Sequence, residues 1–204
     1  MLDDITRSLI TAASLGVKPA ARTELAEYLR TLKDKNTVTG EQLYEVFLQT
    51  YLFAGFPAAL ESVRILEKVF GIVHSGLTKI EEEIAAEYLQ FMQRGDDLYK
   101  TIYATNATRV RDELLRLSPE LATWALIEGY GKTLSRPGVD TKTRELCIVA
   151  QLSQLGWERQ LYSHLLGARN SGASIEEITE AITIGTRGDP YLFGHAEQLV
   201  KKLV

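Results

Sequence analysis

Glu145 and His164 are the two residues of this chain whose types and spacing best suit chemistry. They lie in two segments of helical periodicity that meet at Gly156, eleven residues after Glu145 and eight before His164. At about 1.5 Å per residue, these heights in a helical hairpin differ by about one turn, so the two side chains can meet. A carboxylate orients a neighbouring imidazole and favours its protonated form, which can deliver a proton near neutral pH. The spacing therefore predicts an acid/base pair.

Two arginines and two tryptophans are further candidates around this pair. Arg136 and Arg144 could bind a substrate carboxylate, because a guanidinium offers a bidentate fork. Trp157 and Trp124 could form walls of the same pocket. The four residues together predict a site for a small molecule that carries a carboxylate.

Each of these residues also has a purely structural interpretation. His164 can be satisfied by a backbone carbonyl, and Glu145 can be a first-turn acid that the helix dipole favours after a cap at Asp140. A surface salt bridge explains either arginine, and aromatic residues at helical spacing belong more often to a core. The other two histidines, His74 and His195, have no partner at a useful spacing, and no cluster of Cys or His stands in the sequence. We therefore expect no metal site.

The segments that must position these residues have the signals of α-helices. Three pairs match the capping box, in which a hydroxyl and a side chain three residues on satisfy opposite backbone donors: Thr39 with Gln42, Thr78 with Glu81, and Ser174 with Glu177. Ser118 before Pro119 and Asp140 predict two more helix starts, and RPGVD (136–140) predicts a tight turn. Strand signals are scarce, so we expect an all-α protein of roughly nine or ten helices, at about 11–12 residues each.

The composition argues against several classes of function. A net charge of -4 gives no basic footprint for nucleic acid or for an anionic membrane surface. The longest apolar stretch, 51–60, is broken by Gly55 and Pro57 and is too short to cross a bilayer. The N-terminus lacks the pattern of a signal peptide, and the one cysteine, Cys147, cannot form an internal disulfide. We therefore expect a cytoplasmic protein without a nucleic-acid or membrane partner.

The chain also resembles itself. Residues 37–47 (TVTGEQLYEVF) align with 172–182 (GASIEEITEAI), and 54–63 align with 187–200, proline on proline, at the similar offsets of 135 and 133. The agreement indicates a degenerate tandem repeat, as in a fused dimer with pseudo-two-fold symmetry. The alternative is that two capped amphipathic helices look alike by chance. We expect a degenerate N-terminal helical repeat at 1–75, a connecting helix at 76–93 and a second copy at 94–204.

From Arg94 to its end, the chain resembles a whole subunit of the carboxymuconolactone decarboxylase family. The stretches RPG-x-D-x-K-T-R-E-L (136–146) and H-x-x-x-A-x-N-x-G (164–172) carry most of this resemblance, and 47–63 resembles the helix that closes the same domain. The resemblance implies the all-helical bundle of the alkyl hydroperoxide reductase D proteins, which assemble as trimers or hexamers. A fused pair would then form a homo-oligomer, a trimer that imitates the hexamer.

The redox branch of this superfamily uses a Glu, a C-x-x-C motif and a His nineteen residues after the Glu. Glu145 and His164 keep that spacing, but the two cysteine positions fall on Trp157 and Gln160, which supply no thiolate. Cys147 lies two residues after Glu145, about 200° away around a helix. It is therefore expected to be a small buried side chain rather than a nucleophile.

The decarboxylase branch also lacks these cysteines and keeps the Glu and the His. The resemblance implies a cofactor-independent enzyme that removes CO2 from, or transfers a proton on, a small carboxylated lactone or related acid. Trp157 and Gln160 would then lie beside the catalytic pair as substrate-binding residues. Two alternatives remain open: a peroxidase-type antioxidant activity, implied by the superfamily alone, and a non-catalytic oligomeric module that binds a ligand or a partner.

Two departures from the family pattern affect these expectations. The N-terminal copy has Glu24 where the His would fall, so that copy is expected to be structural. The stretch 186–199 replaces the family's aromatic-Gly-x-Pro-Ala run, so the substrate is expected to differ from carboxymuconolactone. Tyr51 and Phe53 from the first half are then candidates to complete the pocket.

Overall fold

The computed structural model describes residues 1–71 and 81–203, and within these ranges every regular element is helical. This confirms the predicted all-α fold. The elements are α1 (Asp4–Gly16), η1 (Pro19–Ala21), α2 (Arg22–Lys35), α3 (Gly40–Phe70), α4 (Glu81–Tyr103), η2 (Ala104–Asn106), α5 (Ala107–Leu117), α6 (Pro119–Trp124), the π-helix η3 (Ala125–Leu134), α7 (Thr141–Leu155), α8 (Glu158–Asn170), α9 (Ile175–Thr186) and α10 (Pro190–Val200). None of the helices in the described ranges is long and apolar enough to span a membrane.

The helix starts follow the predicted side-chain signals. Both bonds of the capping box are present at Thr39 on α3 and at Ser174 on α9. Ser118 accepts the first-turn N–H of Leu121, and Asp140 accepts the N–H of Thr143 at 3.0 Å. The predicted box at Thr78 lies outside the described residues. Where a side-chain oxygen satisfies an orphan backbone donor, the helix begins at the expected residue.

The chain divides into two compact units, which do not coincide with the predicted boundaries. One unit combines 1–74 with 138–204, and the other comprises 75–137. The predicted boundaries at 75/76 and 93/94 concern repeated sequence segments and stay predictions. In the first unit, the two ends of the chain share one core.

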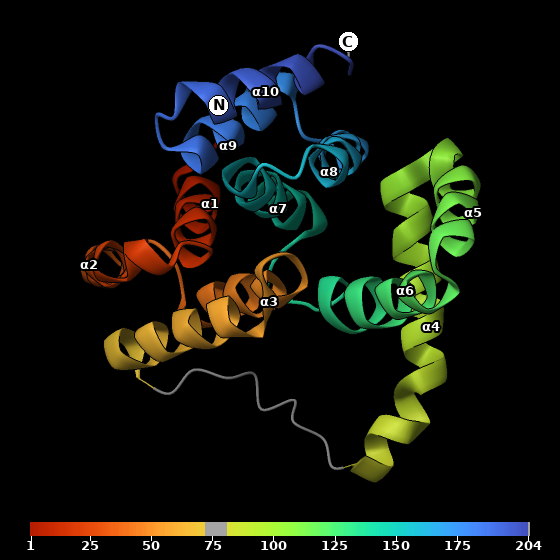
Figure 1. Ribbon diagram of the computed structural model, residues 1–204. Coiled ribbons are helices and arrows are strands. Elements are labelled where there is room, and N and C mark those ends of the chain that lie inside the picture. The colour runs from red at the N-terminus through yellow and green to blue at the C-terminus, as the bar shows by residue number, and fades with distance from the viewer. Residues whose placement is uncertain (72–80, 204) are drawn as a thin grey trace. The chain divides into compact units, whose positions relative to one another are not determined.

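The core of the first unit is built around α7, which Figure 1 shows among α1, α3, α8, α9 and α10. Twelve of the 15 residues of α7 are buried, polar ones included. The approach of α9 is especially close, because a Cβ at Gly185 would lie 2.7 Å from the Cα of Ala150. A helix enclosed in this way has almost no surface on which solvent can satisfy a polar side chain.

Helix α3 has a kink that resembles the junction between α9 and α10. Gly55 has φ 80° and ψ 166°, and Pro57 follows two residues later. At the second junction Gly188 has φ 80° and Pro190 begins α10. Only glycine adopts such positive φ without strain, and proline suits the first turn of the helix that follows. Both junctions have a glycine of positive φ two residues before a proline, while the duplication of a whole unit stays a prediction.

The second unit packs α4 against the π-helix η3 through glycines. A Cβ at Gly95 would collide with the backbone of Leu126, and one at Gly131 with the backbone of Phe91. Between these helices lie three tyrosines, with the hydroxyls of Tyr103 and Tyr130 2.8 Å apart. Burial raises the pKa of the third, Tyr99, to about 12. The small residues thus allow two backbones to meet while aromatic rings fill the remaining space.

The close contact between α9 and α7 can be tested with an alanine. We expect Gly185→Ala to lower the free energy of unfolding by about 1–3 kcal/mol, because the new methyl group would overlap the backbone of α7. Urea denaturation followed by circular dichroism measures the change. The matched control is Gly194→Ala on α10, where a Cβ has no neighbour within 4 Å. This control should raise the free energy of unfolding by about 0.5–1 kcal/mol. Equal effects of the two substitutions would contradict the assigned contact.

Candidate functional site

Glu145 and His164 lie in contact, on α7 and α8. The Nδ1 atom of His164 is 2.8 Å from Oε2 of Glu145, and both residues are buried, with exposed fractions of 7% and 1%. The two helices form the predicted hairpin because Gly156 ends α7 in the left-handed conformation, with φ 72°. A carboxylate at hydrogen-bond distance orients the imidazole. The arrangement suits proton transfer, while a catalytic role for the pair stays a prediction.

A third side chain at this pair comes from the N-terminal part of the chain. The ring of Phe53 on α3 meets that of His164 edge to face, with centroids 5.3 Å apart and planes at 87°. Tyr51, the other candidate from this helix, is half-buried. Thus α3 supplies an aromatic wall for the imidazole from a segment about a hundred residues earlier in the chain.

Arg144 and Glu145 are adjacent in the chain but bind different partners. Glu145 contacts His164, whereas Arg144 binds residues of α3 and the turn before α7. Its Nη2 lies 3.0 Å from Oε2 of Glu45, its Nη1 donates to Gln49 at 3.2 Å, and its Nε donates to the carbonyl of Val139 at 3.1 Å. Arg144 is only 1% exposed. A substrate carboxylate would have to displace Glu45 to reach this guanidinium.

The remaining predicted site residues are not gathered at the pair. Trp157 and Gln160 lie exposed at the start of α8, and Trp157 is 59% exposed, so it is not a core residue. Trp124 is also exposed, Arg136 is half-buried, and both belong to the unit 75–137. Arg136 and Trp124 therefore have no defined position relative to Glu145 and His164.

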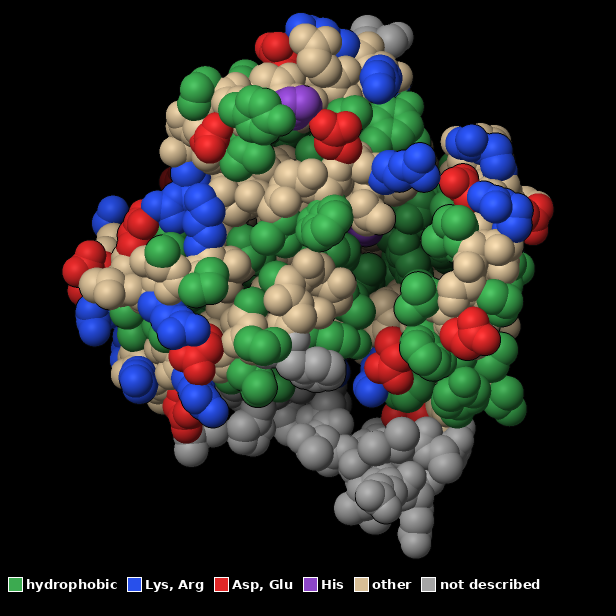
Figure 2. Space-filling model, viewed as in Figure 1, with side chains coloured by type: hydrophobic (Ala, Val, Ile, Leu, Met, Phe, Trp, Pro, Cys, Tyr) green, Lys and Arg blue, Asp and Glu red, His purple; other side chains and the backbone are tan. Residues whose placement is uncertain are grey.

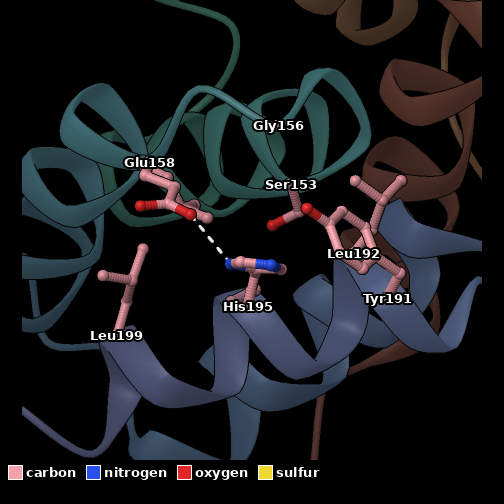
Figure 3. Close-up of a pocket in the computed structure, with 9 residues that line it drawn as sticks. Ser153, Gly156, Glu158, Tyr191, Leu192, His195 and Leu199 are labelled. Atoms are coloured by element: carbon pink, nitrogen blue, oxygen red, sulfur yellow. Dashed lines mark ion pairs between the residues drawn. The ribbon is translucent and has the colours of Figure 1, made fainter.

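A second contact between a carboxylate and an imidazole was missed by the sequence analysis. Nδ1 of His195 on α10 lies 2.8 Å from Oε1 of Glu158 on α8, and the ring of Tyr191 lies 4.5 Å from that of His195. These residues border a cavity of about 80 Å³, which Leu161 and Leu199 also line. Figure 3 shows Glu158, Tyr191, His195 and Leu199 around this cavity. His195 and Glu158 are about half exposed, so solvent screens this pair more than the buried one. The one available sequence signal was the periodicity of two helices, which does not tell which of their faces meet.

Cys147 lies deep in α7 with an exposed fraction of zero. Burial raises the pKa of its thiol far above the usual range, so the reactive thiolate is scarcely populated. Within the part of the chain that the structure describes, no three side chains of His, Cys, Asp or Glu are grouped as a metal site requires. The site as built offers proton-transfer groups and no accessible thiol.

A comparison with models of protein families finds a match. The model of the carboxymuconolactone decarboxylase family matches residues 120–198, which include Glu145, His164, Trp157 and Gln160. Over these residues, the chain is similar to the carboxymuconolactone decarboxylase family. The all-α architecture agrees with the helical bundle expected for the alkyl hydroperoxide reductase D superfamily. A comparison with curated proteins finds no match to the chain.

Part of the surroundings of the candidate site lies outside the segment 120–198 that the family model matches. Phe53, Glu45 and Gln49 all lie on α3, far ahead of residue 120. The predicted resemblance is thus confirmed over 120–198, while the interpretation of the first half as a second copy stays a prediction.

The burial of Cys147 leads to a test with a thiol reagent. We expect 5,5′-dithiobis(2-nitrobenzoate) to modify the folded protein about 10³-fold or more slowly than the protein in denaturant, because reaction must await opening of the core. The control is the same reaction in guanidinium chloride, where one thiol per chain should react at once. Rapid modification of the folded protein would show that Cys147 is accessible and would reopen a thiol mechanism.

Proposed function

We propose that this protein is a cofactor-independent enzyme of the carboxymuconolactone decarboxylase type, acting on a small carboxylated lactone or related acid. The observation that carries the proposal is the buried contact of 2.8 Å between Glu145 and His164. The family relationship of 120–198 supports the class of reaction. A cytoplasmic location, where the lone thiol would stay reduced, belongs to the same proposal.

The proposed reaction uses the pair for one proton transfer. The bond between the substrate carbon and its carboxylate breaks, CO2 leaves, and the electron pair passes to the adjacent carbonyl group as an enolate. The imidazolium of His164 then delivers its proton to the carbon, while Glu145 orients the ring and stabilises its positive charge. Solvent returns a proton to His164 for the next cycle. Trp157 and Gln160, exposed at the start of α8, are the proposed substrate-binding residues in the same unit as the pair.

Burial of the pair favours a second candidate function, a non-catalytic module that binds a ligand or a partner. The cavity beside His195 does not include Glu145 or His164. In this alternative the buried pair only holds α7 against α8. The third candidate, a peroxidase of the thiol type, has weaker support, because Trp157 and Gln160 occupy the cysteine positions and Cys147 is buried.

Release of CO2 tests the leading proposal. We expect a panel of carboxylated γ-lactones to include a substrate on which His164→Ala lowers kcat about 10²- to 10⁴-fold, the usual range for a general acid. The matched control is His195→Ala, which removes the other imidazole–carboxylate contact and should leave the rate unchanged. Equal rates for wild type and His164→Ala would refute the role of His164. Loss of activity in His195→Ala alone would indicate that the active site is the cavity in Figure 3.

Homo-oligomerisation is part of the proposed function. In the unit 75–137, α4, α5 and α6 expose large apolar side chains, and Figure 2 shows hydrophobic side chains over α5 and α6. They are Tyr88, Leu89, Met92, Leu115, Leu117, Leu121 and Trp124. Apolar side chains gathered in this way mark surfaces that bind other proteins.

Multi-angle light scattering measures this assembly. We expect a particle of about three times the 22.8 kDa of the chain, the trimer that would imitate a hexamer of single units. Leu121→Glu with Trp124→Glu should shift the mass toward one chain, because two charges would have to be buried at the contact. Lys132→Glu on the exposed side of η3 is the matched surface control. A monomer in the wild-type protein would rule out the trimer.

A further inference from the structure

One face of α3 contacts the candidate site at three successive turns. Glu45, Gln49 and Phe53 are spaced at i, i+4 and i+8, so they lie in one row along the helix. The first two bind the guanidinium of Arg144, and the third packs on the ring of His164. A single helix from the first half of the chain thus contacts both helices that carry the candidate pair.

The bond to Arg144 is also a bond to the backbone of α7. Gln49 accepts from the guanidinium through its carbonyl oxygen and donates its amide to the backbone oxygen of Arg144 at 3.3 Å. Glu45 is 4% exposed and Arg144 1%, so this ion pair lies in a region of low dielectric, where an unpaired charge is costly. The orientation in which the two charges meet is therefore strongly preferred.

A second polar contact lies two turns further along the same face of α7. Gln151, seven residues after Arg144, donates to the hydroxyl of Thr50 on α3 at 2.7 Å. Two contacts on one face, about 10 Å apart along the axis, oppose rotation of the helix. Glu145 follows Arg144 by one residue, about 100° around the helix, and this step points it toward α8 and His164.

We propose that Glu45, acting through Arg144, is a positioning residue for the Glu145–His164 pair. This inference rests on the proposed function for its catalytic meaning, but the placement of the imidazole that it describes can be measured without any reaction. By fixing the rotation of α7, the ion pair sets the direction from which Glu145 meets Nδ1 of His164. The first half of the chain, which carries no acid/base pair of its own, thereby takes part in the site.

The decisive experiment is nuclear magnetic resonance of the imidazole groups in protein labelled with ¹⁵N-histidine. The chain has only three histidines, so His74→Gln and His195→Gln assign the signals of His164 by difference. In Glu45→Gln, which keeps the shape of the side chain and removes its charge, we expect a displaced Nδ1 signal for His164. The signals of His195 should stay in place. Once a substrate is known, kcat should fall about 10- to 100-fold with KM nearly constant, as misplacement of a catalytic group predicts.

The matched control is Glu180→Gln, which removes the charge from an ion pair between α9 and α1 in the same unit. It should leave the signals of His164 unchanged. If Glu45→Gln fails to fold, Glu45→Leu combined with Arg144→Met replaces the buried charges by apolar groups that preserve folding. This double variant lacks the ion pair but keeps the bonds of Gln49 to the backbone of α7 and of Gln151 to Thr50, so a displaced signal of His164 would be due to the loss of the ion pair.

Unchanged signals of His164 in folded Glu45→Gln or in the double variant would overturn the positioning role, whatever the activity. This outcome together with a loss of turnover in His164→Ala would leave the proposed function standing. Conversely, displaced signals without turnover on any acid would support the positioning role and contradict the enzyme. The two proposals therefore fail in distinguishable ways.

Discussion

The burial of α7 is the constraint on which the rest of the first unit depends. A polar side chain inside a protein must find a partner there, because the desolvation of an unpaired group costs free energy. Arg144 binds Glu45 and Gln49 on α3 and the carbonyl of Val139 before α7, and Glu145 meets His164 on α8. Gln151 donates to Thr50 on α3, although its Oε1 accepts no bond, and Ser153 bonds to the carbonyl of Val149 within its own helix. The partners of these side chains thus lie in different directions around the axis of α7. Apolar packing alone tolerates small rotations of a helix, whereas rotation of α7 would stretch several of these polar contacts at once.

The features that could be predicted from the sequence depend on residues that lie close together in the chain. Glu145 and His164 belong to one hairpin, so helix rise and a turn at Gly156 suffice to bring them to similar heights. Helix starts are equally local, because a side chain three residues away provides the capping bond. The partner of Arg144 is a different problem, since Glu45 is 99 positions away and 27 acidic residues compete for that role. The choice is made by the packing of α3 on α7, which no spacing encodes.

Two further features had no sequence signal, because they also depend on how helices pack against each other. Residues 125–134, which include Gly129 and Gly131, form a π-helix against α4, and nothing in their sequence distinguishes a π-helix from an α-helix. Gly95 and Gly131 allow the backbones of these helices to approach closely, and this tertiary contact competes with the usual hydrogen-bond pattern of an α-helix. The contact between His195 and Glu158 likewise requires the second half of the hairpin and α10 to meet face to face. Periodicity predicts that each helix has an apolar side, but it does not pair the sides.

The position of Phe53 bears on how a substrate would be selected. In the low dielectric of the core, the attraction between Glu145 and a protonated His164 is stronger than in water, and the ring of Phe53 helps to exclude water from it. The same enclosure leaves His164 only 7% exposed, so a substrate must approach along that edge or move Phe53 aside. Because Phe53 lies outside the segment 120–198, the residues that would control access differ in origin from those that would perform the chemistry. The wall that α3 forms beside His164 is thus a feature of this chain that the match over 120–198 does not include.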